Sequence, residues 1–600
     1  MSTLPTGLQD WIYKLEEGEW VRHLKLALVF LALAALTFWY DLREFKNFST
    51  PEAMDTAQLA RNLSEGKGYT TRFIRPLSMA LLQQKRSGGE PILKEEHPDL
   101  ANPPVYPLLL AGLMKSLPFR YEMSGGTTFK RYQPELLIAL FNQALFFVVI
   151  YVVFQLAKRL FDAPVAWLSA VVVAGTNLLW RFTVSGLSTL LLITLFLGIV
   201  WCLVKMEQSA REEKHGNIWM ILMAVATGLL VALGGLTRYS FAWLILPVVA
   251  FFALYFGQRR ATLCLSALAA FLVVMGPWLM RNYHVGGTLF GTAGYAIYQE
   301  TSSYPGNRLE RSMPANLEQE LKNPGLNQYV RKFLIQMSEI VENDLPKLGG
   351  SWVSAFFLVG LLVPFRSPAL ARLRVFLLSC LLVLVIAQAL GRTHLSVESP
   401  EVNSENLLVL LVPLVFMFGV AMYFVFLDQL AVPLPQLRTM ANGLFVLVAC
   451  APLAFTLLPP RSSPFAYPPY YPPLIQEAAK WMQENELMMS DMPWAVAWYG
   501  HRRCVWVTLD AGANPRKSDF FAINDFQNPI QGLYLTQLTM NAQFLSQMLK
   551  GQEWAWGRFV LESLLRTNVP TGFPLKEAPS GFLPDQLFLS DRVRWKGQPK

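Results

Sequence analysis

The chain has 600 residues, of which 53% are hydrophobic and only 16% are charged, and its formal net charge is +9. This composition excludes a string of soluble domains and an intrinsically disordered chain, because apolar runs of bilayer length recur throughout the sequence. It also excludes a disulfide scaffold, since four of the five cysteines lie inside apolar runs, namely Cys202, Cys264, Cys380 and Cys450. We therefore expect an α-helical polytopic membrane protein.

Eleven apolar runs have the length and composition of membrane-spanning helices. In chain order they are residues 23–40, 136–157, 164–180, 186–204, 217–236, 239–257, 261–280, 351–365, 375–391, 407–427 and 441–458. Every second connection is basic, with Lys and Arg residues within 158–159, 205–214, 259–260, 366–374 and at 438. The positive-inside rule then places the N-terminus in the cytoplasm and the C-terminus outside. These anchors account for the net charge, so no nucleic-acid partner is expected.

The large polar segments all fall on the predicted outer side, as two loops and a tail that span residues 41–135, 281–350 and 459–600. We expect residues 1–458 to form a transmembrane domain that is followed by a proline-rich linker, 459–473. Residues 474–600 alternate between helical and strand patterns, which predicts a small extracytoplasmic α/β domain. Because loops this long usually carry function, the chemistry is expected at the outer face.

The first outer loop opens with a predicted helix from Pro51 to about Leu63, because Thr50 is a good N-cap and proline suits the first helical position. One stripe of this helix carries small residues and the other is polar, with Glu52 and Asp55 one turn apart. The small stripe suits packing against a membrane bundle, which would present both carboxylates to a cavity just outside the bilayer. In the alternative interpretation, Glu52 only complements the helix dipole and Asp55 is solvated.

Several outer-face cations are candidates for holding a phosphate group. Arg72 and Arg75 follow the acidic helix, and Arg238 and Arg281 lie at the ends of apolar runs. Arginine binds phosphate bidentately, but the same residues also serve as lipid-headgroup contacts or snorkelling anchors. Tyr106 begins an apolar segment, 106–117, that is too short to span and predicts an interfacial helix; its ring suits the interface, and its hydroxyl could face a ligand.

Other motifs are absent from the sequence. The six histidines are scattered, no Cys/His cluster has zinc-ligand spacing, and neither a phosphate-binding glycine loop nor a serine nucleophile elbow occurs. No dedicated metal or cofactor site is indicated, although a divalent cation is compatible with the sequence. Four outer glutamates are either solvated loop residues or helpers of Asp55, namely Glu300, Glu398, Glu401 and Glu405.

Three segments together resemble the C-type (GT-C) glycosyltransferase superfamily, in the branch of the protein O-mannosyltransferases and the aminoarabinose transferase. They are the acidic helix at 52–62 with Glu65-Gly66-Lys67-Gly68, the Pro-Pro-x-Tyr-Pro-Leu-Leu-Leu run at 103–110, and Gly276-Pro277-Trp278 followed by Arg281-Asn282 and Gly286-Gly287. With the topology, this resemblance covers about residues 20–430.

The resemblance implies a membrane glycosyltransferase that moves a hexosyl or pentosyl group from a polyprenyl-phosphate donor to a hydroxyl of a glycan, lipid or protein acceptor. The reaction would take place at the extracytoplasmic face of a bacterial inner membrane. Asp55 is the expected general base, with Glu52 as its alternative, because Pro51 and Glu52 stand where the family often has an Asp-Glu pair. Asn102 replaces the Lys that often precedes the family's Pro-Pro run.

Two alternatives belong to other functional classes. A transporter or flippase for a lipid-linked saccharide would place polar residues or broken helices near the bilayer midplane, whereas these spans are nearly free of charge. A catalytically inactive relative that binds glycolipid is the second alternative, which the shifted acidic position keeps open.

Overall fold

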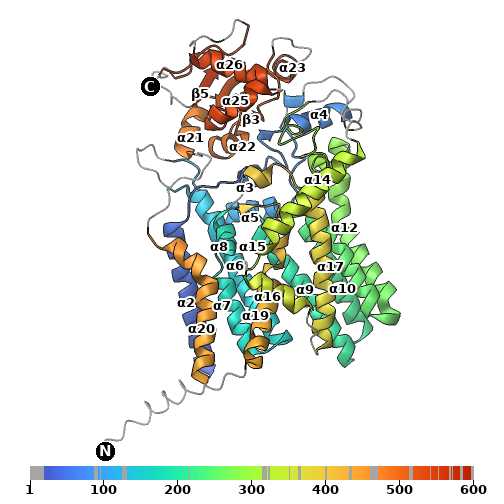
Figure 1. The fold of residues 1–600 in the computed structure, drawn as a ribbon. Helices are drawn as coiled ribbons and strands as arrows, with labels where there is room; N and C mark the ends of the chain where they lie inside the picture. The colour runs from blue at the N-terminus through green and yellow to red at the C-terminus, as the bar shows by residue number, and fades with distance from the viewer. Residues whose placement is uncertain are drawn as a thin grey trace, which may run out of the picture.

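The computed structural model describes residues 19–86, 92–94, 96–123, 131–213, 215–313, 321, 325–350, 352–362, 367–398, 402–430, 435–459, 471–512, 518–540, 542–551, 553–565, 569, 572–580 and 586–595. The chain forms a helical bundle, a layer of loops and short helices across one end of it, and a small sheet above that layer (Figure 1). Most of the predicted linker, residues 460–470, lies outside the described residues.

The bundle helices coincide with the predicted spans. They are α2 (Glu19–Arg43), α6 (Gln133–Leu160), α7 (Ala163–Ala174), α8 (Asn177–Val184), α9 (Thr189–Glu212), α10 (Asn217–Gly235), η2 (Tyr239–Leu244), α11 (Ile245–Tyr255), η3 (Gly257–Arg259), α12 (Arg260–Gly286), α16 (Trp352–Leu362), α17 (Pro368–Gly391), η7 (Leu407–Leu411), α19 (Val412–Gln429) and α20 (Pro435–Leu457).

The expected helical membrane fold is thereby confirmed. Within the described residues, seven helices are long and apolar enough to cross a membrane, and the number rises to nine if each of two bent pairs is one span. One of these pairs is α7 and α8, which bend by 51° inside the predicted span 164–180. The count of eleven spans stays a prediction.

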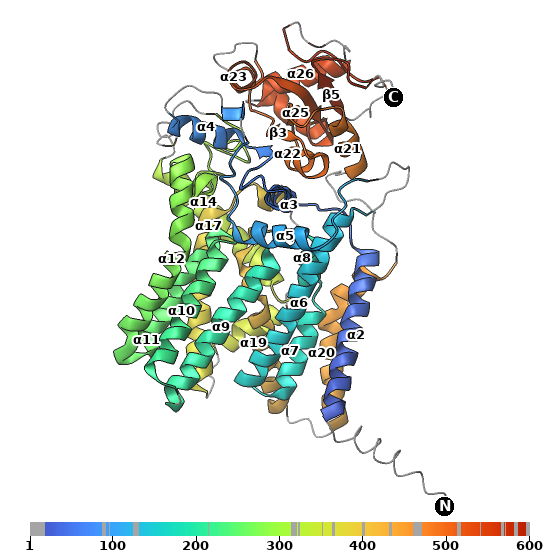
Figure 2. The same ribbon diagram turned by 180° about the vertical axis from the view of Figure 1, so that it is seen from behind.

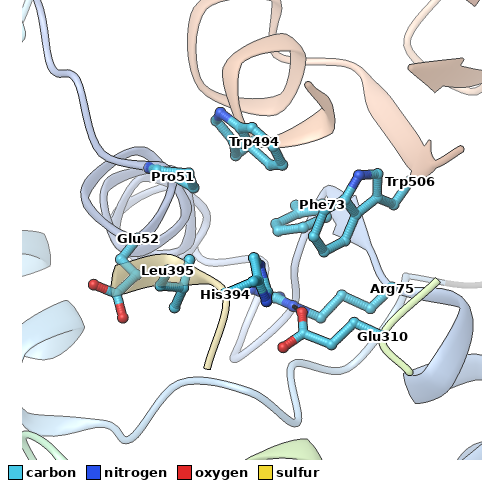
Figure 3. Close-up of a pocket in the computed structure, with 9 residues that line it drawn as sticks. All are labelled: Pro51, Glu52, Phe73, Arg75, Glu310, His394, Leu395, Trp494 and Trp506. Carbon is cyan, nitrogen blue, oxygen red and sulfur yellow. Dashed lines mark hydrogen bonds and ion pairs between the residues drawn. The ribbon is translucent and has the colours of Figure 1, made fainter. Parts of the chain in front are cut away.

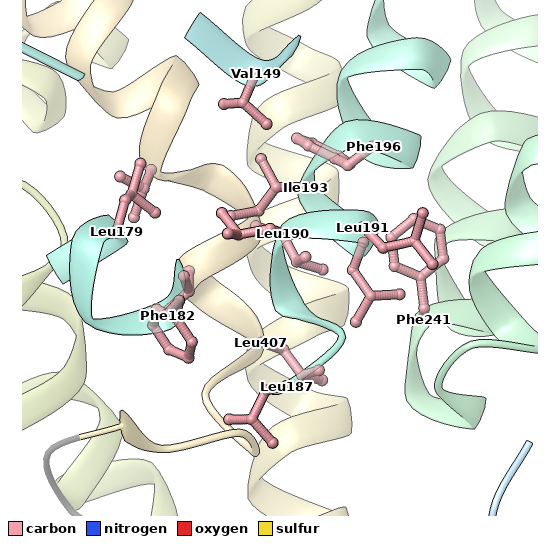
Figure 4. Close-up of a cluster of buried hydrophobic side chains, with 14 of the residues drawn as sticks. Val149, Leu179, Phe182, Leu187, Leu190, Leu191, Ile193, Phe196, Phe241 and Leu407 are labelled. Atoms are coloured by element: carbon pink, nitrogen blue, oxygen red, sulfur yellow. The ribbon is translucent and has the colours of Figure 1, made fainter. Parts of the chain in front are cut away.

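Apolar side chains and close helix contacts hold the bundle together. Figure 4 shows the centre of its core, where Leu190, Ile193 and Phe196 of α9 meet Val149 of α6 and Leu179 of α8. Burial of each such side chain contributes about 1.5–3 kcal/mol where water is displaced, and tight packing replaces that driving force within lipid.

Glycine allows the closest approach of two bundle helices. A Cβ atom at Gly228 of α10 would lie 2.2 Å from the carbonyl oxygen of Ala267 in α12, so only glycine fits there.

The outer layer consists of short helices at the outer end of the bundle, and the segment at residues 326–339 packs alongside α17 (Figure 1). These short helices are α3 (Pro51–Ser64), α4 (Pro76–Lys85), η1 (Ile92–Lys94), α5 (Val105–Ser116), η4 (Gly291–Tyr295), α14 (Leu326–Glu339), η5 (Ile340–Asp344), α15 (Leu345–Lys347) and α18 (Leu395–Glu398). Both ribbon views show α5 lying across the end of the bundle with α3 above it (Figures 1 and 2). A helix therefore forms where 106–117 was predicted to be helical, and its position at the membrane interface stays a prediction.

A five-stranded sheet lies above this layer, with the strand order β1-β3-β2-β4-β5. The strands are β1 (Phe73–Ile74), β2 (Leu487–Ser490), β3 (Arg503–Trp506), β4 (Ile530–Leu535) and β5 (Leu587–Ser590). All pairings are parallel except β4 with β5. The accompanying helices are α21 (Pro472–Lys480), α22 (Pro493–Ala495), a π-helical turn η8 (Val496–Gly500), α23 (Asp519–Phe526), α24 (Gln537–Met540), α25 (Ala542–Lys550) and α26 (Trp554–Leu565).

Several contacts join the first outer loop to the C-terminal segment, and two of them show how the sheet is held on the bundle. Strand β1 comes from the loop and pairs with β3, so that Phe73 lies opposite Cys504. At the start of α6, the fully buried carboxylate of Glu135 accepts hydrogen bonds from Trp498 Nε1 at 2.9 Å and Tyr499 Oη at 2.6 Å. Because a buried carboxylate needs such donors, this contact fixes the sheet region on the bundle.

Candidate active site

Helix α3 presents its two carboxylates differently, although both lie on its polar stripe. The helix begins at Pro51, as predicted, and packs its small residues against α5. Asp55 is only 1% exposed, whereas the side chain of Glu52, one turn earlier, is 26% exposed. Asp55 therefore faces protein, and Glu52 is the carboxylate that a ligand can reach.

Asp55 is the centre of a buried polar network. Its Oδ2 atom accepts hydrogen bonds from Arg75 Nη2 at 2.8 Å and from Asn102 Nδ2 at 2.9 Å. Its Oδ1 atom accepts from Gln58 Nε2 at 3.1 Å. Both carboxylate oxygens are thus engaged with neighbouring side chains, which holds Arg75 in one orientation.

Arg75 connects this network to the second outer loop. Its Nε atom donates to Glu310 Oε2 at 3.2 Å, and its guanidinium lies 4.0 Å from the centre of the Phe73 ring. Burial alone would lower the pKa of Arg75, but the carboxylates of Asp55 and Glu310 outweigh it and raise that pKa. Burial likewise opposes ionisation of Glu310, yet Arg75 holds the pKa of Glu310 below its ordinary value.

A turn at Asp99 positions Asn102. Asp99 Oδ1 accepts from the backbone N–H groups of Ala101 and Asn102 at 3.0 and 2.7 Å, and its Oδ2 atom accepts from Asn102 Nδ2 at 3.1 Å. Burial, together with the nearby Asp55 carboxylate, raises the pKa of Asp99 to about 6. This turn brings the Asn102 amide, at the position where the resemblance expects Lys, directly onto Asp55.

A small cavity opens beside this network (Figure 3), with about 290 Å³ of space when the open solvent at its mouth is included. Its charged and polar lining consists of Glu52, Arg75, Glu310 and His394. Its apolar lining is provided by Pro51, Phe73, Leu395, Trp494 and Trp506. The walls therefore combine both outer loops with the C-terminal segment, which supplies the two tryptophans.

Arg238 is the cation that lies opposite Glu52. Its Nη2 atom is 3.6 Å from Glu52 Oε1, and its Nη1 atom donates to the backbone oxygen of Ser404. Both charged side chains of the pair remain partly exposed. Arg238 stands directly before η2, in the short connection that follows the apolar helix α10.

Arg281 touches the same network through a backbone atom. Its Nη1 atom donates to the Asp99 oxygen at 2.6 Å, and its guanidinium lies 4.9 Å from the Trp278 ring centre and 5.3 Å from that of Tyr69. The predicted motif residues 276–282 thus support the Asp99 turn.

Two further predicted residues contact other parts of the protein. Arg72 is buried, and its Nη1 atom donates to the His501 carbonyl at 3.0 Å, which ties the loop to the C-terminal segment. Tyr106 is also buried, and its hydroxyl donates to the Gly186 carbonyl at 3.0 Å and to Asn142 Oδ1 at 3.2 Å. Neither residue lines the cavity.

Several residues of this region had no clear signal in the sequence. Glu310 and His394 stand alone in long connections of the sequence. They are identified as site residues only because they line the same cavity as Arg75 and Glu52. Of the outer glutamates considered as helpers, Glu405 is buried and accepts hydrogen bonds from Thr393, while Glu300 does not line the cavity. Glu401 and the side chain of Glu398 lie outside the described residues.

The part of the chain that the structure describes holds no group of three or more His, Cys, Asp or Glu side chains placed to bind a metal ion. The charged groups of the site are instead arranged as alternating carboxylates and guanidinium groups, an arrangement suited to proton transfer and to the binding of a phosphate anion.

Comparison with known proteins identifies the fold. Residues 129–280 match the family model described as dolichyl-phosphate-mannose-protein mannosyltransferase. No curated protein matches the sequence. The oligosaccharyltransferase of Archaeoglobus fulgidus, tethered with an acceptor peptide, is similar with a TM-score of 0.54 and 11% identity, over 91% of this chain and 72% of that chain.

Two further solved structures carry lipid phosphates. ArnT from Cupriavidus metallidurans, bound to undecaprenyl phosphate, is similar with a TM-score of 0.53 and 10% identity, over 96% of this chain and 99% of that chain. AglB from Archaeoglobus fulgidus, in complex with an inhibitory peptide and a dolichol-phosphate, has a TM-score of 0.53 and 12% identity, over 90% of this chain and 72% of that chain. The fold is that of the GT-C glycosyltransferases, as the resemblance predicted.

Proposed function

We propose that the chain is an integral membrane glycosyltransferase that moves a sugar from a polyprenyl-phosphate donor to an acceptor hydroxyl at the extracytoplasmic face. The observation that carries this proposal is the cavity at the outer end of a GT-C fold, where Glu52 and Arg75 line one hollow and Arg238 stands beside it. The lipid phosphates bound to ArnT and AglB support a donor of the same class.

The reaction requires a base for the acceptor and cations for the leaving group. The acceptor hydroxyl would lose its proton to a carboxylate while its oxygen bonds to the anomeric carbon. The bond from that carbon to the phosphate oxygen would break, and the lipid phosphate would leave with the electron pair. An arginine placed at the departing oxygen would stabilise its charge.

We assign the base to Glu52, and a positioning role to Asp55. The sequence favoured Asp55, but its two oxygens already accept hydrogen bonds from Arg75, Asn102 and Gln58. Glu52 lines the cavity and is partly exposed, so an acceptor can reach its oxygens without breaking a buried network. Asp55 serves the reaction by holding Arg75 at the cavity wall.

We assign the binding of the departing phosphate to Arg238, with Arg75 as the second cation. Arg238 stands at the end of a bundle helix and is partly exposed, so the phosphate of a lipid carrier can approach from the membrane. Arg75 lines the cavity on the side that faces away from Glu52 (Figure 3). Arg281 acts on the site indirectly, by supporting the Asp99 turn. We assign no phosphate contact to Arg72, because its guanidinium donates to the His501 carbonyl.

The transferred sugar is assigned to the aromatic part of the cavity. Trp494, Trp506 and Phe73 line this part with nearly buried aromatic rings that pack edge to face on one another, and Glu310 and His394 add polar groups beside them. A pyranose or furanose ring has the matching character, with apolar C–H faces and a rim of hydroxyl groups. The finer choice between a hexosyl and a pentosyl group would depend on how the ring fills this space.

Donor turnover by the purified protein tests the proposal. The full chain would be reconstituted in liposomes with a radiolabelled polyprenyl-phosphate sugar and a mixture of acceptor glycans and lipids, and release of free polyprenyl phosphate would be measured. The proposal expects release that depends on the acceptor. Movement of intact donor across the bilayer without bond cleavage would instead establish a flippase, and binding without either event would establish an inactive glycolipid-binding protein.

A further inference from the structure

A second cavity lies at the opposite end of the bundle from the proposed active site. It is an open hollow with about 600 Å³ of space, including open solvent, and it lies where α6 ends and where α9 connects to α10. Its lining includes Arg159 of α6, Lys205, Ser209 and Glu212 of α9, and His215 and Trp219. This end carries the basic connections that predict the cytoplasmic side.

Two cations of this cavity make cation–π contacts with the same aromatic ring. The guanidinium of Arg159 lies 5.6 Å from the ring centre of Trp201, and the ammonium of Lys205 lies 5.1 Å from the same centre. Arg159 also donates from Nε to Gln208 Oε1 at 2.7 Å, which fixes its orientation. Two like charges held on one ring repel each other, and an anion bound between them would relieve that repulsion.

The other wall of the cavity adds polar groups. The His215 ring stacks on Trp219 with a centroid distance of 4.4 Å, and its Nδ1 atom lies 2.9 Å from Ser209 Oγ. Glu212 is the carboxylate in the lining, and the ion pairs found in the described part of the chain do not join it to Arg159 or Lys205. The cavity therefore has two cations, one carboxylate and further hydrogen-bonding groups around one space.

Exposed apolar side chains follow the lining residues along the chain, at the start of α10. Ile218 and Leu222 of α10, which begins two residues after His215, are 77% and 58% exposed. Residues four apart share a helix face, so the two side chains form an apolar track that leads away from the cations. In a membrane this track would contact acyl chains, whereas a small soluble anion has no apolar part that could contact it.

We propose that this cavity binds the phosphate headgroup of an anionic phospholipid, with the acyl chains lying along Ile218 and Leu222. Basic pockets between membrane helices on the cytoplasmic side are suited to such headgroups. Arg159 and Lys205 would hold the phosphate, while the stacked His215 ring closes one wall. This site is separate from the proposed sugar transfer and does not depend on it.

Native mass spectrometry of the full chain in detergent tests this site, with phosphatidylglycerol and phosphatidylcholine as competing probes. Retention of one phosphatidylglycerol in preference to phosphatidylcholine is expected. Arg159→Gln or Lys205→Gln should each weaken this retention about fivefold, since one cation near a membrane surface contributes about that factor. Lys205→Arg should retain the lipid, which separates loss of charge from loss of fold.

The matched control is Arg438→Gln, because Arg438 is an exposed cation that pairs with Asp428 at 2.6 Å and does not line the cavity. This variant should bind phosphatidylglycerol like the parent protein. Equal retention of the two lipids, or an equal loss in Arg438→Gln and Lys205→Gln, would overturn the proposal. Displacement of the lipid by inorganic phosphate at the same concentration would assign the cavity to a free anion and would likewise overturn it.

Discussion

Arg75 and Asp55 form a buried ion pair, in which Nη2 of the arginine donates to Oδ2 of the aspartate at 2.8 Å while the aspartate is screened from solvent. The pair joins α3 to the strand β1 that enters the sheet. The pair therefore encloses one carboxylate of α3, while the side chain of the other, Glu52, stays partly exposed, which is the basis of the proposed roles.

Replacement of Glu52 by glutamine should abolish transfer while leaving the fold intact. A general base contributes about 10²–10⁴-fold to the rate, and glutamine cannot accept the acceptor proton. We therefore expect a fall of this size in turnover, with donor binding retained, as measured by release of polyprenyl phosphate. Glu477→Gln is the matched control, because Glu477 is an exposed residue of α21 that pairs with Lys480. Full activity in Glu52→Gln would contradict the assignment of the base.

Replacement of Asp55 by asparagine should act first on stability. Breaking a buried ion pair by removing one partner typically costs about 3–5 kcal/mol, because the remaining charge stays buried. The thermal unfolding temperature of Asp55→Asn in detergent should fall well below that of the parent, whereas Asp428→Asn, which alters an exposed pair, should leave it unchanged. An unfolding temperature of Asp55→Asn equal to that of the parent would contradict the structural role of the ion pair.

Replacement of Trp506 by leucine should affect sugar binding more than the chemical step. The tryptophan lines the cavity together with Trp494, and the loss of one aromatic face should raise the KM for the sugar donor about tenfold, a contribution of about 1.4 kcal/mol. Initial rates over a range of donor concentrations separate KM from kcat. Trp219→Leu, at the other end of the bundle, is the control. An unchanged KM in Trp506→Leu would remove the aromatic wall from the proposed sugar site.

His97 should make stability depend on pH. Burial, followed by repulsion from Arg503, lowers the pKa of this histidine from 6.5 to about 3, and its Nε2 atom lies 2.8 Å from Ser78 Oγ. Between pH 6.5 and 3 the unfolded chain binds a proton at this residue and the folded chain does not. The free energy of unfolding is therefore unaffected by this residue above pH 6.5. Below pH 6.5, protonation of His97 in the unfolded chain lowers the free energy of unfolding by up to about 1.4 kcal/mol per pH unit.

Unfolding of the parent and of His97→Gln, followed from pH 7 to pH 4, measures this contribution. Asp99 acts in the opposite direction, since its pKa of about 6 lets the folded chain keep a proton that the unfolded chain loses near pH 3.8. The difference between the two curves isolates His97. The exposed His284 provides the control variant His284→Gln, whose curve should run parallel to that of the parent. A parallel curve for His97→Gln would show that His97 does not carry the effect.

Glu135 should control the attachment of the C-terminal segment. Its carboxylate accepts from Trp498, from Tyr499 and from the Phe48 backbone N–H at 2.9 Å. Glutamine keeps the shape but loses one acceptor, and hydrogen bonds to a charged group contribute about 1.5–3 kcal/mol. Limited proteolysis of Glu135→Gln should release the C-terminal segment faster than in the parent or in Glu477→Gln. Equal rates in all three proteins would contradict this role.

Local sequence patterns determined most of the helices. The apolar runs have the bilayer length that a spanning helix requires, and basic residues mark their ends. Thr50 and Pro51 likewise placed the start of α3 at the residue where the helix begins. Such signals depend on neighbours in the chain, so they can be recognised without knowledge of the fold.

The roles of the two carboxylates depended on the tertiary structure. Glu52 and Asp55 are one helical turn apart, and the sequence pattern treats them alike; only the packing of α3 against α5 and the approach of Arg75 and Asn102 decide which one is enclosed.

The same holds for the cavity walls. Glu310, His394 and Trp506 come from distant segments that share no periodic pattern with α3. Spacing along a helix encodes which face a side chain takes, but the neighbour across that face is set by long-range packing and by the sheet that β1 joins.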